Sequence, residues 1–467
     1  MLVGARAARQ RAGAARVGRS KEQRMTEATG DKQAVVLSGG GANGAYEIGV
    51  MKALFAGNVP QTTGAKPLDP GIFAGTSVGS YNAAFLVSHW DVYGTAAIGG
   101  LEQTWLDMVC SSTTKPQNGI FRIRDSPREF GNPYSYLPNP LMPLNHLVVD
   151  SAVLAWDGLQ RIVNLIADQS VPLLERAAAL FNFSSFVDME PFRQTVQKTV
   201  WFTDLRQSSK ELLIIGTNWE LGQARRFKKS DMTNQLGPQI ILASAAIPGF
   251  FPMQPVGAQF FVDGGVLLNT PITPVIEEFK DVDILHVISL FPDIDRIPLA
   301  HELSKQSTLA MAYRQQVIAW AKALREEINN YRDLNDRIGL VRLLLGASIN
   351  LARVSPEDAF LAEEAFKTLV RNRPPAELQP LLEAMNQNPL LKKRTIHHYY
   401  PGDDISGALG LLDFDRDRIV MLIERGFEDA MAHNCETNKC VRKEDPLVLL
   451  PLQADNPSVQ MHSLAQS

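Results

Sequence analysis

Residues 34–44 read AVVLSGGGANG, an apolar run that ends in a glycine-rich turn. About thirty residues later, residues 72–79 read IFAGTSVG, a second apolar run that closes on a serine between glycines. Glycine lets the backbone approach a ligand closely, so the first segment can present several N–H groups to an anion. The second has the strand–turn–helix pattern of a nucleophile elbow, with Ser77 at the turn. The two segments predict two of the three parts of an acyl-transfer site.

The region around these segments predicts an α/β fold. Residues 33–90 have the order strand, glycine turn, helix, strand, sharp turn and helix. The apolar residues of 44–56 and 78–89 recur at helical spacing, whereas 72–74 is a short run of strand formers. Strands that alternate with helices of this length form a parallel sheet covered on both faces. We therefore expect one βαβ half of an α/β domain here.

Further along the chain, four segments rich in β-branched and aromatic residues are predicted as strands. They are residues 200–203, 212–217, 259–262 and 284–289. Helical spacing of apolar residues predicts four later helices. They are residues 302–349, 356–372, 376–386 and 415–433. Residues 100–195 are interpreted as an insertion that covers a site, with plain helical packing at the domain edge as the alternative.

These patterns suggest four regions. We expect a basic disordered arm over 1–32, a catalytic domain over 33–295, a helical extension over 296–440 and a flexible tail over 441–467. The arm is rich in Ala and Arg, and two interpretations stay open: a disordered leader or upstream start before Met25, and a transit-like or lipid-attracted arm. Neither a secretory signal peptide nor a transmembrane helix is evident. The expected location is cytoplasmic, with peripheral membrane contact as a further option.

Composition narrows the classes of partner and cofactor. A net charge of −4 gives no general reason to expect nucleic acid as a partner. Three cysteines are too few for a disulfide scaffold, and free thiols are expected, with a bridge between Cys435 and Cys440 as the alternative. We find no His/Cys cluster at ligand spacing along the sequence, so no metal is expected. No other cofactor is expected either.

The glycine turn has two functional interpretations. Gly39, Gly40 and Gly41 with Gly44 fit the dinucleotide fingerprint G-x-G-x-x-G, and they also fit an oxyanion hole at a helix N-terminus. A dinucleotide site needs an acidic residue at the end of the second strand, whereas Asp69 precedes that strand. An oxyanion hole built from Gly39 to Ala42 is therefore favoured. A nucleotide-binding oxidoreductase stays the alternative.

The base for Ser77 is expected to be a carboxylate. None of the eight histidines lies in a loop after a late strand, and His286, inside an apolar strand, is predicted to be a packed core residue. Asp263 ends the apolar run 260–262 and is followed by Gly264 and Gly265. Such an acid accepts the serine proton directly if burial raises its pKa. The structural alternatives are an ordinary Asp-Gly-Gly turn and a serine that merely caps the helix after it.

In this order, the glycine turn, the G-x-S-x-G segment and the Asp-Gly-Gly segment resemble the patatin-like phospholipases. Residues 243–252, ASAAIPGFFP, resemble a further block that precedes the aspartate in that family. The resemblance implies a three-layer α/β/α sandwich with a mostly parallel central sheet, here with an inserted cap region and a helical C-terminal extension. It implies a Ser77–Asp263 dyad without histidine and oxyanion donors among Gly39, Gly40, Gly41 and Ala42. The motif-supporting glycines are Gly44, Gly75, Gly79, Gly264 and Gly265.

The resemblance also implies a lipid acyl hydrolase of phospholipase A, lysophospholipase or esterase type, acting on a lipid or fatty-acyl ester. One departure is Asn43, where the family often carries Arg or Lys; another is the long insertion over 100–195. Both bear on substrate preference. Apolar residues over 340–351 are predicted either to contact a membrane or to pack in a core. A catalytically silent scaffold that binds a partner through 301–433 is the remaining alternative.

Overall fold

The computed structural model describes residues 31–123, 187–296, 308–349 and 391–444, apart from a few positions within these ranges, together with residue 388. The predicted helices at 356–372 and 376–386 lie outside the described residues. So do the basic arm up to residue 30 and the middle of the predicted insertion. The chain divides into two compact units. They are Met1–Tyr331 with Arg394–Arg442, and Arg332–Lys393 with Lys443–Ser467.

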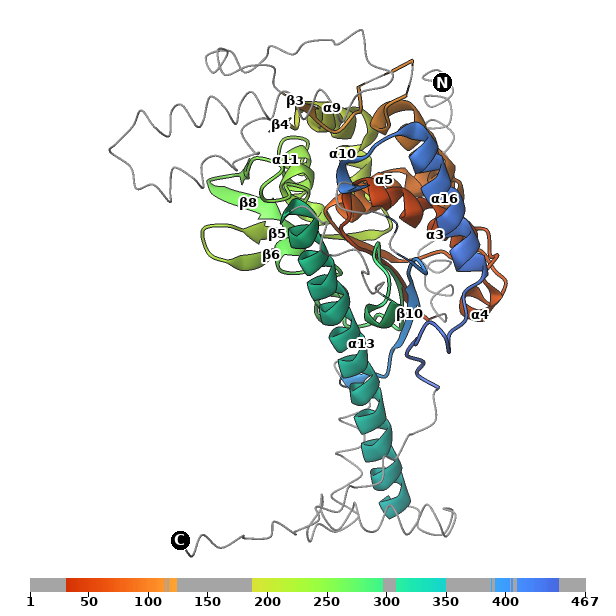
Figure 1. Cartoon of the computed structure of the whole chain (residues 1–467). Coiled ribbons are helices and arrows are strands. Elements are labelled where there is room, and N and C mark those ends of the chain that lie inside the picture. The colour runs from red at the N-terminus through yellow and green to blue at the C-terminus, as the bar shows by residue number, and fades with distance from the viewer. Residues whose placement is uncertain are drawn as a thin grey trace, which may run out of the picture. The chain divides into compact units, whose positions relative to one another are not determined.

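The elements of the described residues follow an α/β order (Figure 1). The strands are β1 Gln33–Leu37, β2 Ile72–Thr76, β3 Arg122–Ile123, β4 Val187–Asp188, β5 Glu211–Asn218, β6 Gln223–Lys228, β7 Gln254–Val256, β8 Gln259–Asp263, β9 Ile284–Ile288 and β10 Thr395–Tyr399. The helices are α3 Gly44–Phe55, α4 Pro60–Thr63, α5 Val78–Tyr93, α6 Ala97–Thr104, α9 Glu190–Thr199, α10 Phe202–Gln207, α11 Leu236–Ser244, α12 Ile272–Glu278, α13 Thr308–Ile349 and α16 Arg416–Met431. Single 3₁₀ turns include η1 Gly41–Asn43, η7 Gly264–Val266 and η12 Gly410–Leu412.

Eight strands form the main sheet, in the order β10-β9-β1-β2-β5-β8-β7, with β6 paired to β5. The pairs from β10 to β5 are all parallel, and the pairs that involve β6, β7 and β8 are antiparallel. The mostly parallel sheet that the sequence predicted is confirmed.

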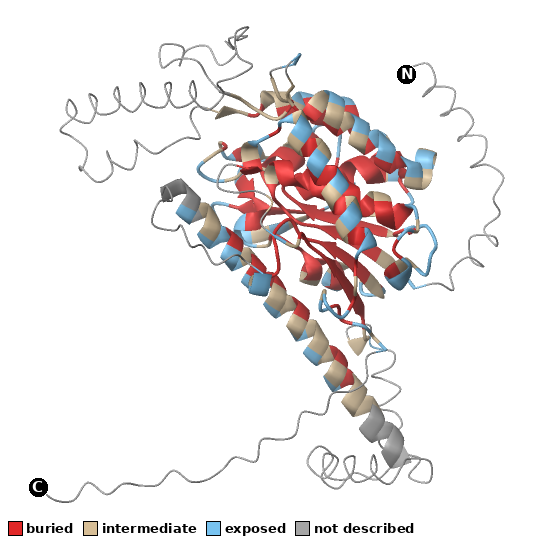
Figure 2. Ribbon diagram, turned by 45° about the vertical axis from the view of Figure 1, so that its right-hand side comes forward, coloured by how far each residue is buried: buried red, intermediate tan, exposed pale blue. Residues whose placement is uncertain are grey.

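Side chains of the central strands alternate between two apolar layers, because successive residues of a strand point to opposite faces. Val35 and Leu37 pack in one layer with residues of α3, α5, α11 and α16. Ala34 and Val36 pack in the other with residues of α12 and of the first part of α13. Figure 2 shows the buried strands enclosed between helices. The predicted α/β sandwich is confirmed.

The register of β5 positions the ends of β2 and β8. Residues 213–215 of β5 pair with both β2 and β6, so these two strands lie on opposite edges of β5. Residues 216–218 pair with both β6 and β8, so β8 lies on the same edge as β2. Thr76 pairs with Ile215, and Asp263 pairs with the next residue, Gly216. The chain leaves β2 at Ser77 and therefore meets the end of β8.

Two sequence-based predictions need correction. Residues 200–203 are not a strand: α10 begins at Phe202, and Phe202 and Leu205 bury their side chains at the i, i+3 spacing of a helix. The sequence analysis included residues 395–399 in a helical extension, whereas they form β10, which pairs in parallel with β9 at the edge of the sheet. The run Thr-Ile-His-His-Tyr has β-branched and aromatic residues that favour a strand.

The predicted helix over 415–433 is confirmed as α16, and it packs on α3 in the same compact unit as the sheet (Figure 1). The two helices approach through Gly49 of α3 and Gly426 of α16. A Cβ added at Gly426 would lie 2.1 Å from the Tyr46 carbonyl oxygen, and one added at Gly49 would lie 1.9 Å from the Ile423 carbonyl oxygen. The two helix backbones approach so closely at these positions that only glycine fits there. Within the described residues, no helix has both the length and the apolar character to cross a bilayer.

The contact between α3 and α16 makes a test of this packing. At an exposed helix position, Gly→Ala stabilises by about 1 kcal/mol. At Gly426 we expect the opposite sign, a loss of about 1–3 kcal/mol, because the added methyl group overpacks the contact. Thermal unfolding of Gly426→Ala, with exposed Glu424→Ala as the control, measures this. A Gly426→Ala protein that is more stable than the wild type would contradict the packing of α16 on α3.

Candidate active site

Ser77 lies at the sharp turn between β2 and α5. Its backbone has φ 55° and ψ −125°, which is an unusual conformation for a residue with a side chain. The hydroxyl of Ser244 accepts a hydrogen bond from the Ser77 amide at 2.9 Å and donates to the Ile215 carbonyl oxygen at 2.6 Å. The Ser77 side chain does not cap α5. The strained turn thus holds the Ser77 hydroxyl without engaging it in the helix.

The glycine turn after β1 lies directly against Ser77. A Cβ added at Gly39 would lie 2.9 Å from the Ser77 Cβ and 2.5 Å from Asn269 Oδ1. Asn269 fixes this glycine on both sides: the Gly39 amide donates to the Asn269 carbonyl oxygen, and Asn269 Nδ2 donates to the Gly39 carbonyl oxygen, each at 3.2 Å. The Gly39 amide therefore already donates a hydrogen bond. The sequence analysis expected this amide to be free to bind an oxyanion.

The next three amides differ from that of Gly39. Among the described residues, we find no hydrogen bond donated by the amides of Gly40, Gly41 or Ala42. Gly41 and Ala42 begin the 3₁₀ turn η1, and the first N–H groups of a helix have no partner within it. Gly41 has φ +56°, and a Cβ there would lie 2.2 Å from the Leu411 carbonyl oxygen. This turn offers a small group of unpaired amides next to Ser77.

Asp263 lies at the end of β8 and is buried, with 5% of its surface exposed. Its Oδ1 accepts a 2.6 Å hydrogen bond from the Gly265 amide. Burial raises the pKa of Asp263 from 3.8 to about 7, while hydrogen bonding by the Ser77 side chain and the Gly265 backbone opposes this rise.

The second carboxyl oxygen of Asp263, Oδ2, has no hydrogen bond of ordinary geometry within the described residues. Hydrogen bonding by the Ser77 side chain opposes the rise in the pKa of Asp263, although no hydrogen bond of standard geometry joins the two side chains among the described residues. Catalytic contacts are often long before substrate binds. Asp263 thus retains one oxygen that is able to receive a proton, which an ordinary Asp-Gly-Gly turn does not require.

The five motif-supporting glycines occupy crowded positions. At each of them, an added Cβ would come within 3 Å of another atom. These glycines are Gly44, Gly75, Gly79, Gly264 and Gly265. At Gly75, for example, the added atom would lie 2.2 Å from the Gly79 carbonyl oxygen across the turn. The turn around Ser77 therefore closes only with these small residues.

An apolar pocket opens onto Ser77 and Gly41. Its empty volume is about 460 Å³, counted with the open space at its mouth. The other lining residues are mainly aliphatic and aromatic and come from several different elements. They include Tyr81, Trp105, Val109, Phe192, Leu412 and Phe414. Ser77 thus lines a cavity whose walls are of the apolar kind that contacts a hydrocarbon chain.

Glu47 and Arg418 each make a contact near the site that the sequence analysis did not predict. Glu47 is fully buried behind the glycine turn and accepts a 2.8 Å hydrogen bond from Asn82 Nδ2, while Trp105 Nε1 donates to Asn82 Oδ1 at 3.0 Å. Burial raises the pKa of Glu47 well above its usual value. An acidic residue three positions after the helix start was the available signal for Glu47.

Arg418 of α16 donates to Asn43 Oδ1 at 2.7 Å. Asn43 is the position at which the sequence analysis noted a departure from the Arg or Lys that is frequent in the patatin-like family. The fold supplies a guanidinium group there from a residue that is 375 positions away in the chain. No local sequence pattern predicts such a contact.

His286 is a packed core residue, as the sequence analysis predicted. This residue is fully buried, its Nδ1 lies 3.2 Å from the Tyr399 hydroxyl, and its Nε2 lies 2.9 Å from Gln33 Oε1. Burial lowers the pKa of His286 well below its usual value. The three cysteines are free thiols, as expected.

The expectation of no His/Cys cluster is wrong. His397, His433, Cys435 and Cys440 are all buried, and their ligand atoms lie within 4.8 Å of one another. The sequence search missed this group because His397 comes from β10 and the other three follow α16. Only the fold brings the two segments together.

The patatin-like phospholipase family profile matches residues 35–276, which is more than half of the chain. The chain belongs to the patatin-like phospholipase family. Membership of this family supports lipid acyl hydrolysis at the level of the family.

Among solved structures, this patatin-like chain is similar to VipD from Legionella pneumophila, with 16% sequence identity and a TM-score of 0.32. The alignment covers 86% of this chain and 66% of VipD. No curated protein matches the sequence.

The dinucleotide alternative finds no support around the second strand. The Asp69 carboxylate accepts hydrogen bonds from Trp90 Nε1 at 3.0 Å and from Lys210 Nζ at 2.5 Å. Asp69 therefore joins structural elements of the patatin-like domain instead of facing the glycine turn as a ribose ligand would.

Proposed function

We propose that this chain hydrolyses fatty-acyl esters of lipids, with Ser77 as the nucleophile and Asp263 as the base. The observation that carries the proposal is the β5 register, because Thr76 and Asp263 pair with the consecutive residues Ile215 and Gly216. This register supports the proposal, because Ser77 follows the end of β2 beside the end of β8. An apolar pocket opens at the same point.

In the first half of the reaction, the proton of the Ser77 hydroxyl moves to Asp263 Oδ2 as Oγ attacks the ester carbonyl carbon. The tetrahedral intermediate collapses when the C–O bond to the leaving group breaks. Asp263 returns the proton to the departing alcohol, and an acyl-enzyme ester on Ser77 remains. A raised pKa near 7 suits an acid–base group that must both accept and donate at neutral pH.

In the second half, a water molecule gives a proton to Asp263 and attacks the acyl-enzyme. The bond to Ser77 Oγ breaks, Oγ takes the proton back, and the fatty acid leaves. The unpaired amides of Gly40, Gly41 and Ala42 are the proposed oxyanion donors in both halves. The Gly39 amide is assigned a structural role instead, because it already donates to Asn269.

The apolar pocket is the proposed acyl site. Burying hydrocarbon there is favourable at about 0.8 kcal/mol for each CH₂ group. Its walls surround Ser77, so an acyl chain that enters it brings its carbonyl group to the hydroxyl and the amides. The substrate class that fits is an ester of a hydrocarbon acid.

Contact with a lipid surface stays a prediction. The side chains beyond residue 342 in the apolar stretch over 340–351 lie outside the described residues. Exposed apolar residues occur instead on β8 and just after it, where Phe260, Val266 and Leu267 are each more than 40% exposed. Such side chains suit the boundary of a bilayer better than bulk water.

Replacing the nucleophile tests the proposal directly. We expect Ser77→Ala to reduce hydrolysis of a chromogenic fatty-acyl ester by at least about 10³-fold and to abolish labelling by a fluorophosphonate. Ser88→Ala, at a buried serine of α5, the helix that follows Ser77, serves as the matched control and should retain both. Undiminished labelling in Ser77→Ala would remove Ser77 from the mechanism. A wild-type protein that takes no label would favour the scaffold alternative.

The pH dependence tests the base. Asp263 works only when it is ionised, so kcat/KM of the wild type should fall about tenfold per pH unit below a pKa of about 7 and level off above it. Asp263→Asn should lose at least about 10²-fold in kcat/KM and lose this limb of the profile. Asp281→Asn, at an exposed carboxylate, should match the wild type. The same limb in Asp263→Asn would assign it to another group.

The pocket assignment makes a prediction about chain length. Leu412 is a half-buried lining residue, and Leu412→Trp fills part of the cavity. We expect kcat/KM for long-chain esters to fall about tenfold while short-chain esters are turned over nearly as before. Leu221→Trp, at an exposed turn between β5 and β6, is the control. An equal loss for short and long chains would argue against this cavity as the acyl site.

A further inference from the structure

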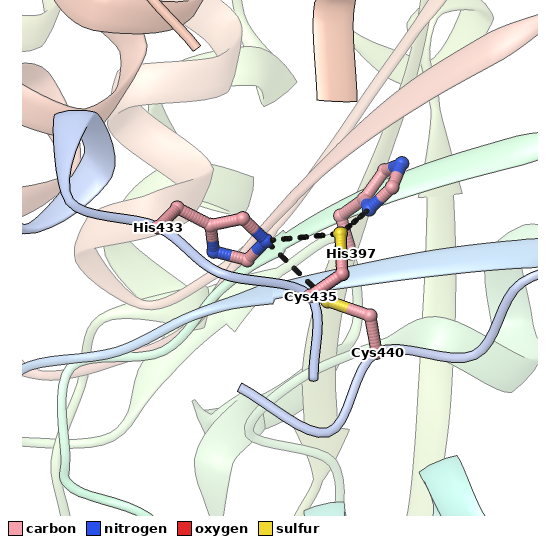
Figure 3. A group of neighbouring side chains, drawn as sticks. All are labelled: His397, His433, Cys435 and Cys440. Carbon is pink, nitrogen blue, oxygen red and sulfur yellow. Dashed lines mark hydrogen bonds between the residues drawn. The ribbon is translucent and has the colours of Figure 1, made fainter. Parts of the chain in front are cut away.

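Four buried side chains with metal-binding atoms lie together in a group that does not include Ser77 or Asp263 (Figure 3). His397 comes from β10, the edge strand of the sheet. His433 follows the end of α16, and Cys435 and Cys440 lie on the loop after it. Each of the four is at most 9% exposed. Neither the family assignment nor the proposed hydrolysis gives this group a role.

The distances in the group match those between the ligands of a tetrahedral metal ion. Cys435 Sγ lies 3.6 Å from His397 Nδ1 and 3.6 Å from His433 Nε2, and Cys440 Sγ lies 3.4 Å from His433 Nε2. A sulfur at about 2.3 Å and a nitrogen at about 2.05 Å from a tetrahedral Zn²⁺ are about 3.6 Å apart. The three separations are close to this value, and all four ligand atoms lie within 4.8 Å of one another.

Hydrogen bonds within the loop fix the positions of Cys435 and Cys440. Asn434 Oδ1 accepts hydrogen bonds from the amides of Glu436 and Thr437, and the Cys440 amide donates to the Cys435 carbonyl oxygen at 2.9 Å. The loop between the cysteines is thus a closed turn. Such a turn fixes two sulfur ligands before a metal arrives.

The same loop is tied to β10. Val441 exchanges two backbone hydrogen bonds with Ile396, which fixes Cys440 beside His397. The amide of His398 also donates to Cys440 Sγ at 3.4 Å. N–H groups aimed at sulfur stabilise a thiolate ligand and orient it. The loop and β10 thus support Cys440 and hold it beside His397.

We propose that His397, His433, Cys435 and Cys440 bind one Zn²⁺ ion as a structural site. Two sulfur and two imidazole donors are a set that suits Zn²⁺, and four protein ligands leave no position for water or substrate. Two thiolates balance the charge of the ion, so the buried group becomes neutral. Binding forms four metal–ligand bonds and releases the thiol protons to solvent.

The ion fixes the C-terminal end of α16 to the edge of the sheet. The N-terminal part of the same helix carries Arg418, which donates to Asn43 beside the glycine turn. Along its length α16 packs on α3, which begins directly after that turn. The metal therefore stabilises the layer that supports the proposed oxyanion amides, without taking part in the reaction.

Metal content of the full-length wild-type protein tests the site first. Purified after growth with added zinc, the protein should carry one tightly held zinc ion per chain by elemental analysis. Exchange with Co²⁺ should give the intense visible bands of tetrahedral coordination and a sulfur-to-cobalt charge-transfer band. Less than half an ion per chain after loading, or an octahedral cobalt spectrum, overturns the proposal. So does a Cys435–Cys440 disulfide found by intact mass and thiol alkylation under reducing purification.

Variants then assign the ligands. We expect Cys435→Ser and His433→Ala to lose the ion and the sulfur-to-cobalt band or its tetrahedral intensity, whereas Cys110→Ser, at a buried cysteine outside the group, keeps both. A chelator should lower the unfolding temperature of the wild type and of Cys110→Ser but not that of Cys435→Ser. Retention of a full zinc ion by Cys435→Ser overturns the assignment. If Cys435→Ser does not fold, the cobalt spectrum of the wild type still decides.

Discussion

The pairing of β5 with three strands is the constraint on which the site depends. One edge of β5 is filled by β6, so β2 and β8 must share the other edge, one after the other. The parallel strand ends at Thr76 and the antiparallel strand ends at Asp263. Two chain segments that are nearly two hundred residues apart in sequence therefore finish at adjacent positions. A shift of one residue in either register would turn the side chains to the opposite face.

Burial changes the pKa of Asp263 at the end of β8. Asp263 is surrounded by apolar layers, and the loss of water raises the pKa of its carboxyl group toward neutrality. A carboxyl group with this pKa can exchange a proton with a serine hydroxyl at neutral pH without a histidine between them. The histidines of β9 and β10 are instead packed in the core, where burial lowers the pKa of His286 and of His398.

Residues Arg394–Arg442 belong to the same compact unit as the sheet. β10 completes the parallel sheet, α16 packs on α3, and Arg418 contacts Asn43 next to the glycine turn. The proposed zinc site joins β10 to the end of α16, the two elements of this segment. Residues after 390 thus reinforce a turn near residue 40, which is why a local sequence pattern for one does not reveal the other.

The sequence by itself determined the elements whose causes are local. Alternating apolar strands and helices predicted β1, α3, β2 and α5, and crowded glycines marked the turn at Ser77. The sequence analysis predicted a strand at residues 200–203. That prediction is wrong, because the packing of Phe202 and Leu205 favours a helix in spite of the strand propensity of these residues. Only the tertiary structure decided what depends on distant pairing: the adjacent ends of β2 and β8, the occupied Gly39 amide, β10, and the His/Cys group. Such contacts arise from strand register and helix packing, and neither is encoded in the spacing of neighbouring residues.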